Sequence, residues 1–362
     1  MAKSSLSKSG SFWRTDWFAG VAIVLAVVVL HQATDAFDAM ERRFYDFAST
    51  STSRQPSDRI AVIAIDDQSI ANLGRWPWSR DIHAKLIDKL AAAKAKTIAQ
   101  TTFFLEPQVD PGLAFIRKMK LVLTSATDSS AANDQLQQLV AEAEVALDTD
   151  AILATSLKSA GNVLLPSVYT LGEQQGKPDN VLPGFVLKSM IDDPNGYSVS
   201  ANRGQQPIEV IGISAAGIGH LNQSYDSDGY VRQEPLLVNY FGKAVPSMAL
   251  LAAAASLNLT PADIRLNVGE SVQIGKLKIK TDTSALMLPQ FYKAKEGKPA
   301  FTVDSFYDVL TDKIPASKYA GKIVIIGATA AGVGVQLSVP GNRALSPAEA
   351  IAHITSSILS AA

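Results

Sequence analysis

The chain contains no cysteine and only four histidines among its 362 residues. The absence of thiols excludes disulfide frameworks, zinc–thiolate sites and cysteine nucleophiles. The histidines form no HExxH pair and no GxSxG elbow is present, so we predict no metal, no cofactor and no enzymatic activity. The remaining chemical inventory is typical of a binding or scaffold domain.

The net charge is equally small, at −1, with 33 basic and 34 acidic residues. This balance argues against a generally basic nucleic-acid-binding protein, and we predict no nucleic-acid partner. Hydrophobic residues make up 47% of the chain and charged residues 19%. These proportions exclude wholesale disorder and predict a packed core.

An uncharged apolar run, residues 18–30, follows a short basic tail at the N-terminus. With its tryptophan-bearing flanks it reaches the ~17–20 residues that a membrane-spanning helix needs. We therefore predict a cytoplasmic tail over residues 1–16 and a transmembrane signal anchor over residues 17–34. Two alternatives stay open: a cleaved signal peptide, because the strictly apolar part is short, and a buried core helix.

A helical apolar stripe continues past this run. Its members recur at steps of three and four residues and are Leu30, Ala33, Phe37, Met40, Phe44 and Phe47. This spacing predicts a stalk helix over residues 35–48, which cleavage would interrupt, so the pattern favours an uncleaved anchor. The stripe is expected to pack either on a second subunit or on the chain's own outer domain.

The rest of the chain alternates buried strands with helices. Strands are predicted at residues 60–65, 97–105, 162–165 and 322–327, and helices at residues 80–93, 113–123, 141–159, 246–257 and 301–310. The first strand–helix–strand unit is expected to have parallel strands and a right-handed connection. Residues 128–134 and 170–205 are expected to form loops, residues 217–221 and 231–240 to pair around a turn, and residues 272–288 to form edge hairpins.

This alternation predicts one mixed α/β domain over residues 49–350, with a largely buried central sheet flanked by helices. The end of the chain, residues 351–362, is expected to be either the approach to a further membrane segment or a truncated end. Polar residues 49–59 are expected to link the stalk to the domain.

Candidate binding residues follow the first predicted strand. Asp66 and Asp67 lie at its carboxyl end, where α/β proteins form ligand crevices, but adjacent side chains on an extended chain face apart and make no shared dyad. Two tryptophans and two arginines then occur within six residues: Arg75, Trp76, Trp78 and Arg80. They either stack on a ligand or bind an anion, or else pin a loop onto the sheet.

Two glycine-containing segments have a structural and a functional interpretation. Asp226 and Asp228 resemble the middle of a calcium loop, but the closing glutamate is missing, and a β-turn explains them equally well. The loop at residues 327–334 follows a strand as nucleotide-binding loops do. It lacks the Lys-Ser/Thr pair of a P-loop, so a tight turn is the simpler interpretation.

Taken together, these landmarks resemble the second type of CHASE domain over nearly all of residues 35–355. The segments that carry the resemblance are IAVIAIDDQS (60–69), LGRWPWSR (73–80), GHLN (219–222), DSDGYVR (226–232) and GKIVIIGATA (321–330). The resemblance implies an extracytoplasmic sensing domain, usually followed by membrane helices and a cytoplasmic kinase, cyclase or phosphodiesterase. It carries over no catalytic residue, and Asn222 and Arg232 join the candidate ligand-binding residues through these segments.

The sequence departs from the pattern of that family at two places. An acidic residue often ends the second strand, whereas this chain has Gln100, Thr101 and Thr102 there. A second acid commonly follows the GATAAG turn, where this chain has residues 333–335, Val-Gly-Val. If those acids bind a cation or polar ligand in relatives, this chain binds differently or not at all.

The sequence therefore favours a periplasmic sensory input domain, single-pass in the bacterial inner membrane, that passes a signal to an output module absent from this chain. Its expected partners are the membrane, a second copy through the stalk, and an unknown small molecule or envelope protein. The main alternative is an anchored periplasmic assembly module without its own output, and a periplasmic enzyme is the least favoured hypothesis.

Overall fold

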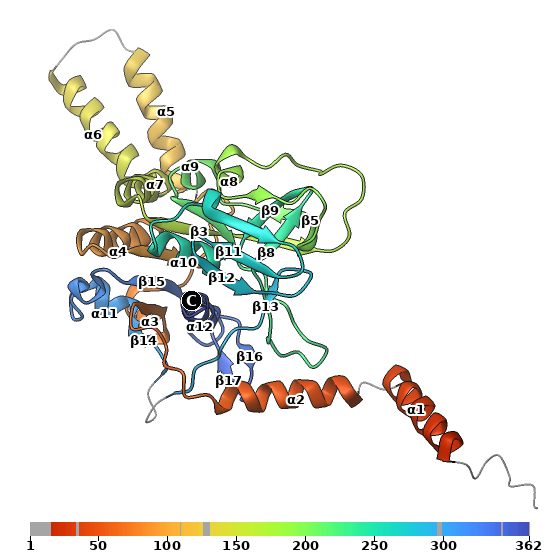
Figure 1. Cartoon of the computed structure of the whole chain (residues 1–362). Coiled ribbons are helices and arrows are strands. Elements are labelled where there is room, and N and C mark those ends of the chain that lie inside the picture. Colours follow the sequence, from red (N-terminus) through yellow and green to blue (C-terminus); the bar gives the residue numbers. More distant parts are fainter. Residues whose placement is uncertain are drawn as a thin grey trace, which may run out of the picture. The chain divides into compact units, whose positions relative to one another are not determined.

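The computed structural model describes residues 16–33, 36–108, 110–125, 131–294, 299–341 and 343–361. The chain divides into two compact units, Met1–Thr52 and Ser53–Ala362. The described part of the first unit consists of two helices, and the second unit is a mixed α/β domain (Figure 1).

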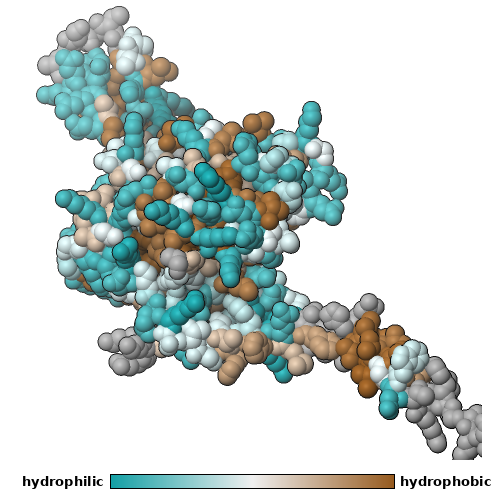
Figure 2. Space-filling model, viewed as in Figure 1, coloured by the Kyte–Doolittle hydropathy of each residue, from teal (hydrophilic) through white to brown (hydrophobic). Residues whose placement is uncertain are grey.

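The first unit contains α1 (Asp16–Ala33) and α2 (Ala36–Ser51). Hydrophobic residues predominate over α1 (Figure 2). Within the described residues, however, no helix is both long and apolar enough to cross a membrane, so the transmembrane part of the fold prediction is not confirmed. Residues 34–35 lie outside the described part, which leaves the predicted continuity of anchor and stalk undescribed.

Four of the six members of the predicted stripe lie on α2, and their side chains are exposed. Met40, Phe44 and Phe47 expose 68, 73 and 70% of their surface, and Phe37 is also exposed. The side chains of Leu30 and Ala33 lie outside the described part. Packing of this stripe on a second subunit therefore stays a prediction.

The second unit is built on a ten-stranded sheet. Its parallel part has the order β14 (Thr302–Ser305), β1 (Ile60–Ile65), β15 (Ile323–Ala328), β2 (Thr97–Gln100), β3 (Val163–Leu171) and β6 (Gly217–His220). The distal half of β3 pairs antiparallel with β5 (Val199–Gln205), and β8 (Leu237–Tyr240), β9 (Lys243–Pro246) and β4 (Ile191–Asp192) follow. β1 and β2 are parallel, as predicted, with β15 inserted between them.

Helices cover both faces of the sheet because successive strand residues point to opposite sides. In β1, Ile63 and Ile65 enter one core, whereas Ile60 and Val62 enter the other. The first core is covered by α3 (Asp67–Leu73), α4 (Arg80–Ala92), α7 (Thr149–Ala160) and α11 (Phe306–Leu310), and the second by α10 (Met248–Ser256) and α12 (Pro347–Leu359). The predicted mixed α/β fold with a buried, helix-flanked sheet is confirmed.

Between α4 and α7, an antiparallel hairpin of α5 (Pro111–Ser125) and α6 (Ala131–Leu147) extends away from the sheet (Figure 1). The expected loop at residues 128–134 is wrong from residue 131 onward, where α6 begins, and residues 126–130 lie outside the described part. Where a single helix was expected over residues 141–159, the structure has the end of α6 and then α7 up to residue 159. The Asp148 side chain separates them, because it accepts a hydrogen bond from the Ala151 N–H and caps the start of α7.

Other segments also differ from expectation. The loop region 170–205 contains β5, an integral strand of the sheet. β6 pairs with β3, so residues 217–221 and 231–240 do not form the expected hairpin. The smaller elements are α8 (Gly184–Leu187), α9 (Glu209–Gly212), β7 (Glu234–Pro235), β10 (Ile264–Asn267), β11 (Ser271–Ile274), β12 (Leu277–Lys280), β13 (Leu286–Met287), β16 (Leu337–Val339), β17 (Arg343–Leu345) and two 3₁₀ turns at Pro261–Asp263 and Ala316–Tyr319.

The last helix, α12, is a core element in its described part. A Ser346–Glu349 capping box starts it, and residues 350–358 are almost entirely buried against α10 and the sheet. The expected domain boundary at residue 350 therefore falls inside α12. Residues 351–358 are buried in the domain. The approach to a further membrane segment stays a prediction.

Candidate functional site

A crevice of about 490 Å³ lies at the carboxyl ends of the parallel strands. Loops after β2, β6 and β15 and the α3–α4 loop enclose it, and this edge is where open α/β sheets bind ligands. Its lining consists of Trp76, Pro77, Thr101, Thr102, Phe103, Val168, Leu221, Gln223, Tyr225, Ala328, Val333, Gly334, Val335, Leu337 and Pro347. None of these side chains carries a charge.

The floor of the crevice depends on a close approach of β2 and β15. Thr101 donates from its N–H (2.9 Å) and from its hydroxyl (3.0 Å) to the Ile326 carbonyl. A Cβ on Gly327 would lie 2.4 Å from the Thr101 Oγ1, so only glycine fits at this position. The chain after β15 then folds back, and a Cβ on Gly334 would lie 2.8 Å from the Ala328 carbonyl oxygen.

Both places where the sequence departs from the family pattern meet in this crevice. Thr101 and Thr102 line it from the end of β2, and Val333, Gly334 and Val335 line it from the turn after β15. Gln100, by contrast, is fully buried, and its Nε2 lies 3.0 Å from the Nδ1 of His83 in α4. Because neither place supplies an acidic side chain, the crevice is large enough for a ligand but has no charged side chain in its lining.

The two tryptophans of the predicted segment have different positions. Trp76 lines the crevice, whereas Trp78 is buried, donates from Nε1 to the Gly74 carbonyl (2.9 Å) and packs on Phe306 at 4.9 Å between ring centroids. Trp76 also contacts Trp78, with ring centroids 5.1 Å apart. Arg75 is exposed and is not part of the crevice lining.

Arg80 pins this segment onto the sheet, which is the structural alternative considered above. Its buried guanidinium pairs with the Asp150 carboxylate, donates to the Glu106 carbonyl and lies over the Phe104 ring. Both charged groups are nearly buried, so the pair is a structural element that does not face the crevice.

Asp66 and Asp67 also have structural positions. The Asp66 carboxylate caps α3: its Oδ1 accepts from the Ser69 N–H (2.8 Å) and hydroxyl (2.5 Å) and from the Ser305 hydroxyl (2.9 Å). Asp67 is exposed in the first turn of α3, where a negative charge is favoured by the helix dipole. Neither residue lines the crevice.

Asn222 and the aspartate turn complete the predicted set. Asn222 is buried, and its side chain accepts from the Tyr169 N–H (3.0 Å) and donates to the Tyr169 carbonyl (2.5 Å). The Arg232 guanidinium is bound by Asp226 (2.7 Å) and Asp228 (2.8 Å), so a cation of the chain itself occupies the two carboxylates. In the described part of the chain, no three His, Cys, Asp or Glu side chains gather as a metal site requires.

Replacing Arg232 with methionine is expected to lower the free energy of unfolding by about 2 kcal/mol, because its charge-assisted hydrogen bonds to the partly exposed aspartates are lost. Excess calcium is expected to leave the thermal unfolding midpoint of the unmodified chain unchanged. Differential scanning calorimetry measures both quantities, and a midpoint that rises with calcium would contradict the turn interpretation.

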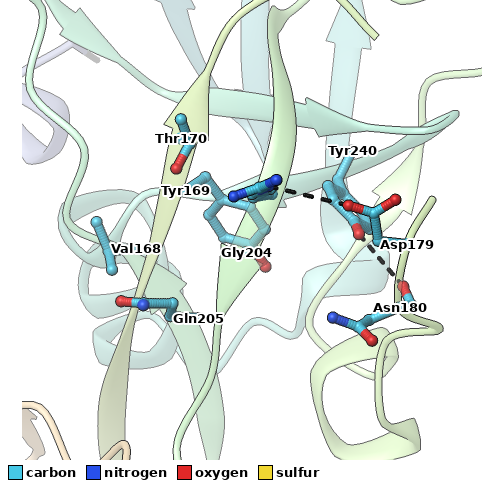
Figure 3. A pocket seen from close by; sticks show the side chains of 9 residues that line it. Val168, Tyr169, Thr170, Asp179, Asn180, Gly204, Gln205 and Tyr240 are labelled. Atoms are coloured by element: carbon cyan, nitrogen blue, oxygen red, sulfur yellow. Dashed lines mark hydrogen bonds and ion pairs between the residues drawn. The ribbon is translucent and has the colours of Figure 1, made fainter. Parts of the chain in front are cut away.

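A second cavity, of about 500 Å³, was not indicated by the sequence, because β5 was expected to be loop. It is lined by Val168, Tyr169, Thr170, Asp179, Asn180, Arg203, Gly204, Gln205 and Tyr240 (Figure 3). The exposed Arg203 and Asp179 are 3.9 Å apart, and the Tyr240 hydroxyl donates to the Asn180 carbonyl at 3.2 Å. This cavity differs from the crevice because it carries charges of both signs.

Comparison with family models decides the relationship that the fold and the crevice suggest. The CHASE2 domain model matches residues 21–362. The chain belongs to the CHASE2 domain family. CHASE2 domains are sensory, extracellular domains of signalling proteins, so the resemblance stated from the sequence is confirmed. Comparisons with curated proteins and with solved structures gave no match.

Proposed function

We propose that this CHASE2 chain is the sensory input domain of a membrane-anchored bacterial signalling protein, and that the carboxyl-edge crevice receives the cue. The observation that carries the proposal is the crevice itself. Loops from four separate places in the sequence converge on it, at the edge where α/β sheets bind ligands. We assign no enzymatic activity to the chain.

The mechanism we propose is a shift between two arrangements of the loops around the crevice. Trp76 forms one wall and the turn at residues 333–335 another, so an occupant contacts both. An occupant shifts the balance only by its difference in affinity for the two arrangements. Trp76 also contacts Trp78, which belongs to the core beneath α4, and His83, which is buried on α4 itself. A movement of Trp76 therefore changes the packing of that core.

In this proposal the main domain lies in the periplasm, and the N-terminal segment anchors it in the inner membrane. The uncharged run at residues 18–30 of α1 and the basic tail before the helix support this placement. A topology test fuses alkaline phosphatase after residue 362. Phosphatase activity in intact cells is expected, and activity of a green fluorescent fusion at the same position would contradict the placement.

The exposed stripe on α2 supports transmission through a second copy. Cysteines introduced by Phe37→Cys and Phe44→Cys are expected to form disulfide-linked dimers in membranes, whereas Arg42→Cys, from the opposite side of α2, is the matched control. The measurement is the dimer fraction on non-reducing gels. Equal cross-linking at Phe44 and Arg42 would contradict transmission through this face.

The α5–α6 hairpin favours a second function, that of an assembly module. Its described apolar side chains Phe115, Leu121, Val122 and Val145 are exposed on the extended hairpin, and α5 shows hydrophobic surface in Figure 2. Its inner seam is held by pairs of Glu144 with Arg117 (3.3 Å) and Lys120 (2.6 Å). The test is a pull-down of the chain with its partner proteins from cells. If a Phe115→Ser, Val122→Ser variant no longer retains those partners but its crevice still binds a small molecule, assembly is favoured over sensing.

A further inference from the structure

The crevice also indicates what chemical class of molecule it takes, an inference that rests on the function proposed above. Every group in its lining is uncharged. An ion entering it would give up hydration without gaining a counter-charge, which is costly in a partly enclosed site. The second cavity offers the contrast, because there Asp179 and Arg203 face the same space.

The polar groups of the crevice are hydrogen-bond acceptors, so a ligand that binds them needs a donor. Gln223 lines the crevice, and its Oε1 is buried without a hydrogen-bond partner among the described residues. The Thr101 hydroxyl donates its proton to the Ile326 carbonyl. Its oxygen can therefore act only as an acceptor toward an occupant of the crevice. A buried acceptor without a partner costs free energy. In our proposal the Gln223 amide turns toward the crevice when an occupant with an O–H or N–H group enters, and the new hydrogen bond removes that cost.

The size and the walls of the crevice favour a planar apolar body. Its volume of about 490 Å³ falls within the range of small-molecule sites. Trp76, Phe103 and Tyr225 contribute aromatic rings to its lining, and Tyr225 exposes 56% of its surface. Exposed aromatic rings around a cavity are suited to stacking on a ring of the ligand.

We propose that the crevice binds an uncharged small molecule with a planar apolar body and at least one hydrogen-bond donor. Aromatic alcohols and neutral heterocycles with a ring N–H have this chemistry. The molecule is held by contact with the aromatic walls and oriented by donation to Gln223.

The test uses the full chain and three naphthalene probes of similar size. At neutral pH, 2-naphthol is uncharged and has a donor, 2-methoxynaphthalene is uncharged without one, and 2-naphthoate is an anion. Isothermal titration calorimetry measures each dissociation constant. We expect 2-naphthol to bind at least about tenfold more tightly than either other probe, which corresponds to the loss of one buried hydrogen bond or more.

Matched variants locate the binding. Val335→Asp places a charge in the crevice at a side chain that is 64% exposed, and Val268→Asp places one at an exposed valine outside it. The first is expected to weaken 2-naphthol binding at least about tenfold and the second to leave it unchanged. Gln223→Met is expected to remove the preference for 2-naphthol over 2-methoxynaphthalene. Thermal unfolding of each variant separates lost binding from lost folding.

The outcomes distinguish this inference from the function on which it rests. Binding of 2-naphthoate at least as tight as that of 2-naphthol, and sensitive to Val335→Asp, overturns the ligand class but keeps the crevice as the receiving site. Binding that is insensitive to Val335→Asp overturns both. No binding of any probe overturns the inference and favours a side chain of a partner protein as the occupant.

Discussion

Replacing Arg80 with leucine is expected to lower the free energy of unfolding by about 3–5 kcal/mol. The Asp150 carboxylate would then be left buried without its guanidinium partner, and the Glu106 carbonyl would lose a donor. Two compensations place the cost near the lower end of that range. The Gln108 N–H still donates to Asp150 (3.1 Å), and Asp150 lies in the first turn of α7, where a negative charge is favoured.

The double variant Arg80→Leu, Asp150→Leu tests the cause of this loss. Removing both charges leaves no unpaired ion, so it is expected to recover most of the stability that the single variant loses. Urea unfolding followed by circular dichroism gives the free energies. If the double variant is as unstable as the sum of the two single variants, packing of the arginine stem, and not the buried charge, is the dominant contribution.

Stability is expected to fall steeply below pH 6.5, because three histidines are buried in the neutral form. Each accepts a hydrogen bond at Nδ1: His83 from the Gln100 amide (3.0 Å), His220 from the Asn222 N–H (3.2 Å) and His353 from the Tyr292 N–H (3.0 Å). Burial lowers the pKa of His83 to about 4 and the pKa values of His220 and His353 to about 3.

Below pH 6.5 these histidines therefore bind protons in the unfolded chain but stay neutral in the folded chain. Each histidine is expected to remove about 2 kcal/mol of stability by pH 5. Nearby Arg80 lowers the pKa of His83 further, and Arg343 does the same for His353. Unfolding free energies measured from pH 7 to pH 5 check this slope, and a flat profile would contradict neutral burial of the histidines.

Glu234 has the opposite effect on the pH dependence of the free energy of unfolding. Burial raises the pKa of its carboxyl to about 8, against an ordinary value near 4.5, so the folded chain keeps a proton that the unfolded chain releases. Its stabilising protonated form is lost as pH rises toward 8, by about 2 kcal/mol between pH 6.5 and 8. We therefore expect maximal stability near pH 6.5. Glu234→Gln is expected to remove the decline above that pH and to steepen the fall in acid, because Glu234 offsets part of the histidine effect between its unfolded and folded pKa values.

The sequence indicated four of the six parallel strands, β1, β2, β3 and β15, because they are local, continuous apolar runs. It missed β14, which falls inside the helix predicted over residues 301–310, and β6, which was expected to pair in a hairpin. Residues 60–65 and 323–327 are buried on both faces, which is what such runs predict. It also located the edge of the sheet where the crevice lies, since Thr101 and Val335 were singled out as departures beside strand ends. Trp76 is the one predicted site residue that lines the crevice.

The other nine candidates are engaged within the fold or exposed away from the crevice, for reasons that sequence spacing does not reveal. The partner of Arg80 is Asp150, 70 positions further along the chain. The mixed composition of residues 170–205 concealed β5 and with it the second cavity, because a half-exposed strand with polar side chains carries little periodic signal. Such pairings depend on tertiary packing, which local patterns do not determine.

Hydrogen–deuterium exchange of the full chain with saturating 2-naphthol tests most directly whether the crevice is the receiving site. We predict slower exchange in residues 101–104 and 328–337, which surround the crevice, and unchanged exchange in residues 199–206 at the second cavity. Protection confined to residues 199–206, with residues 328–337 unaffected, would contradict the account.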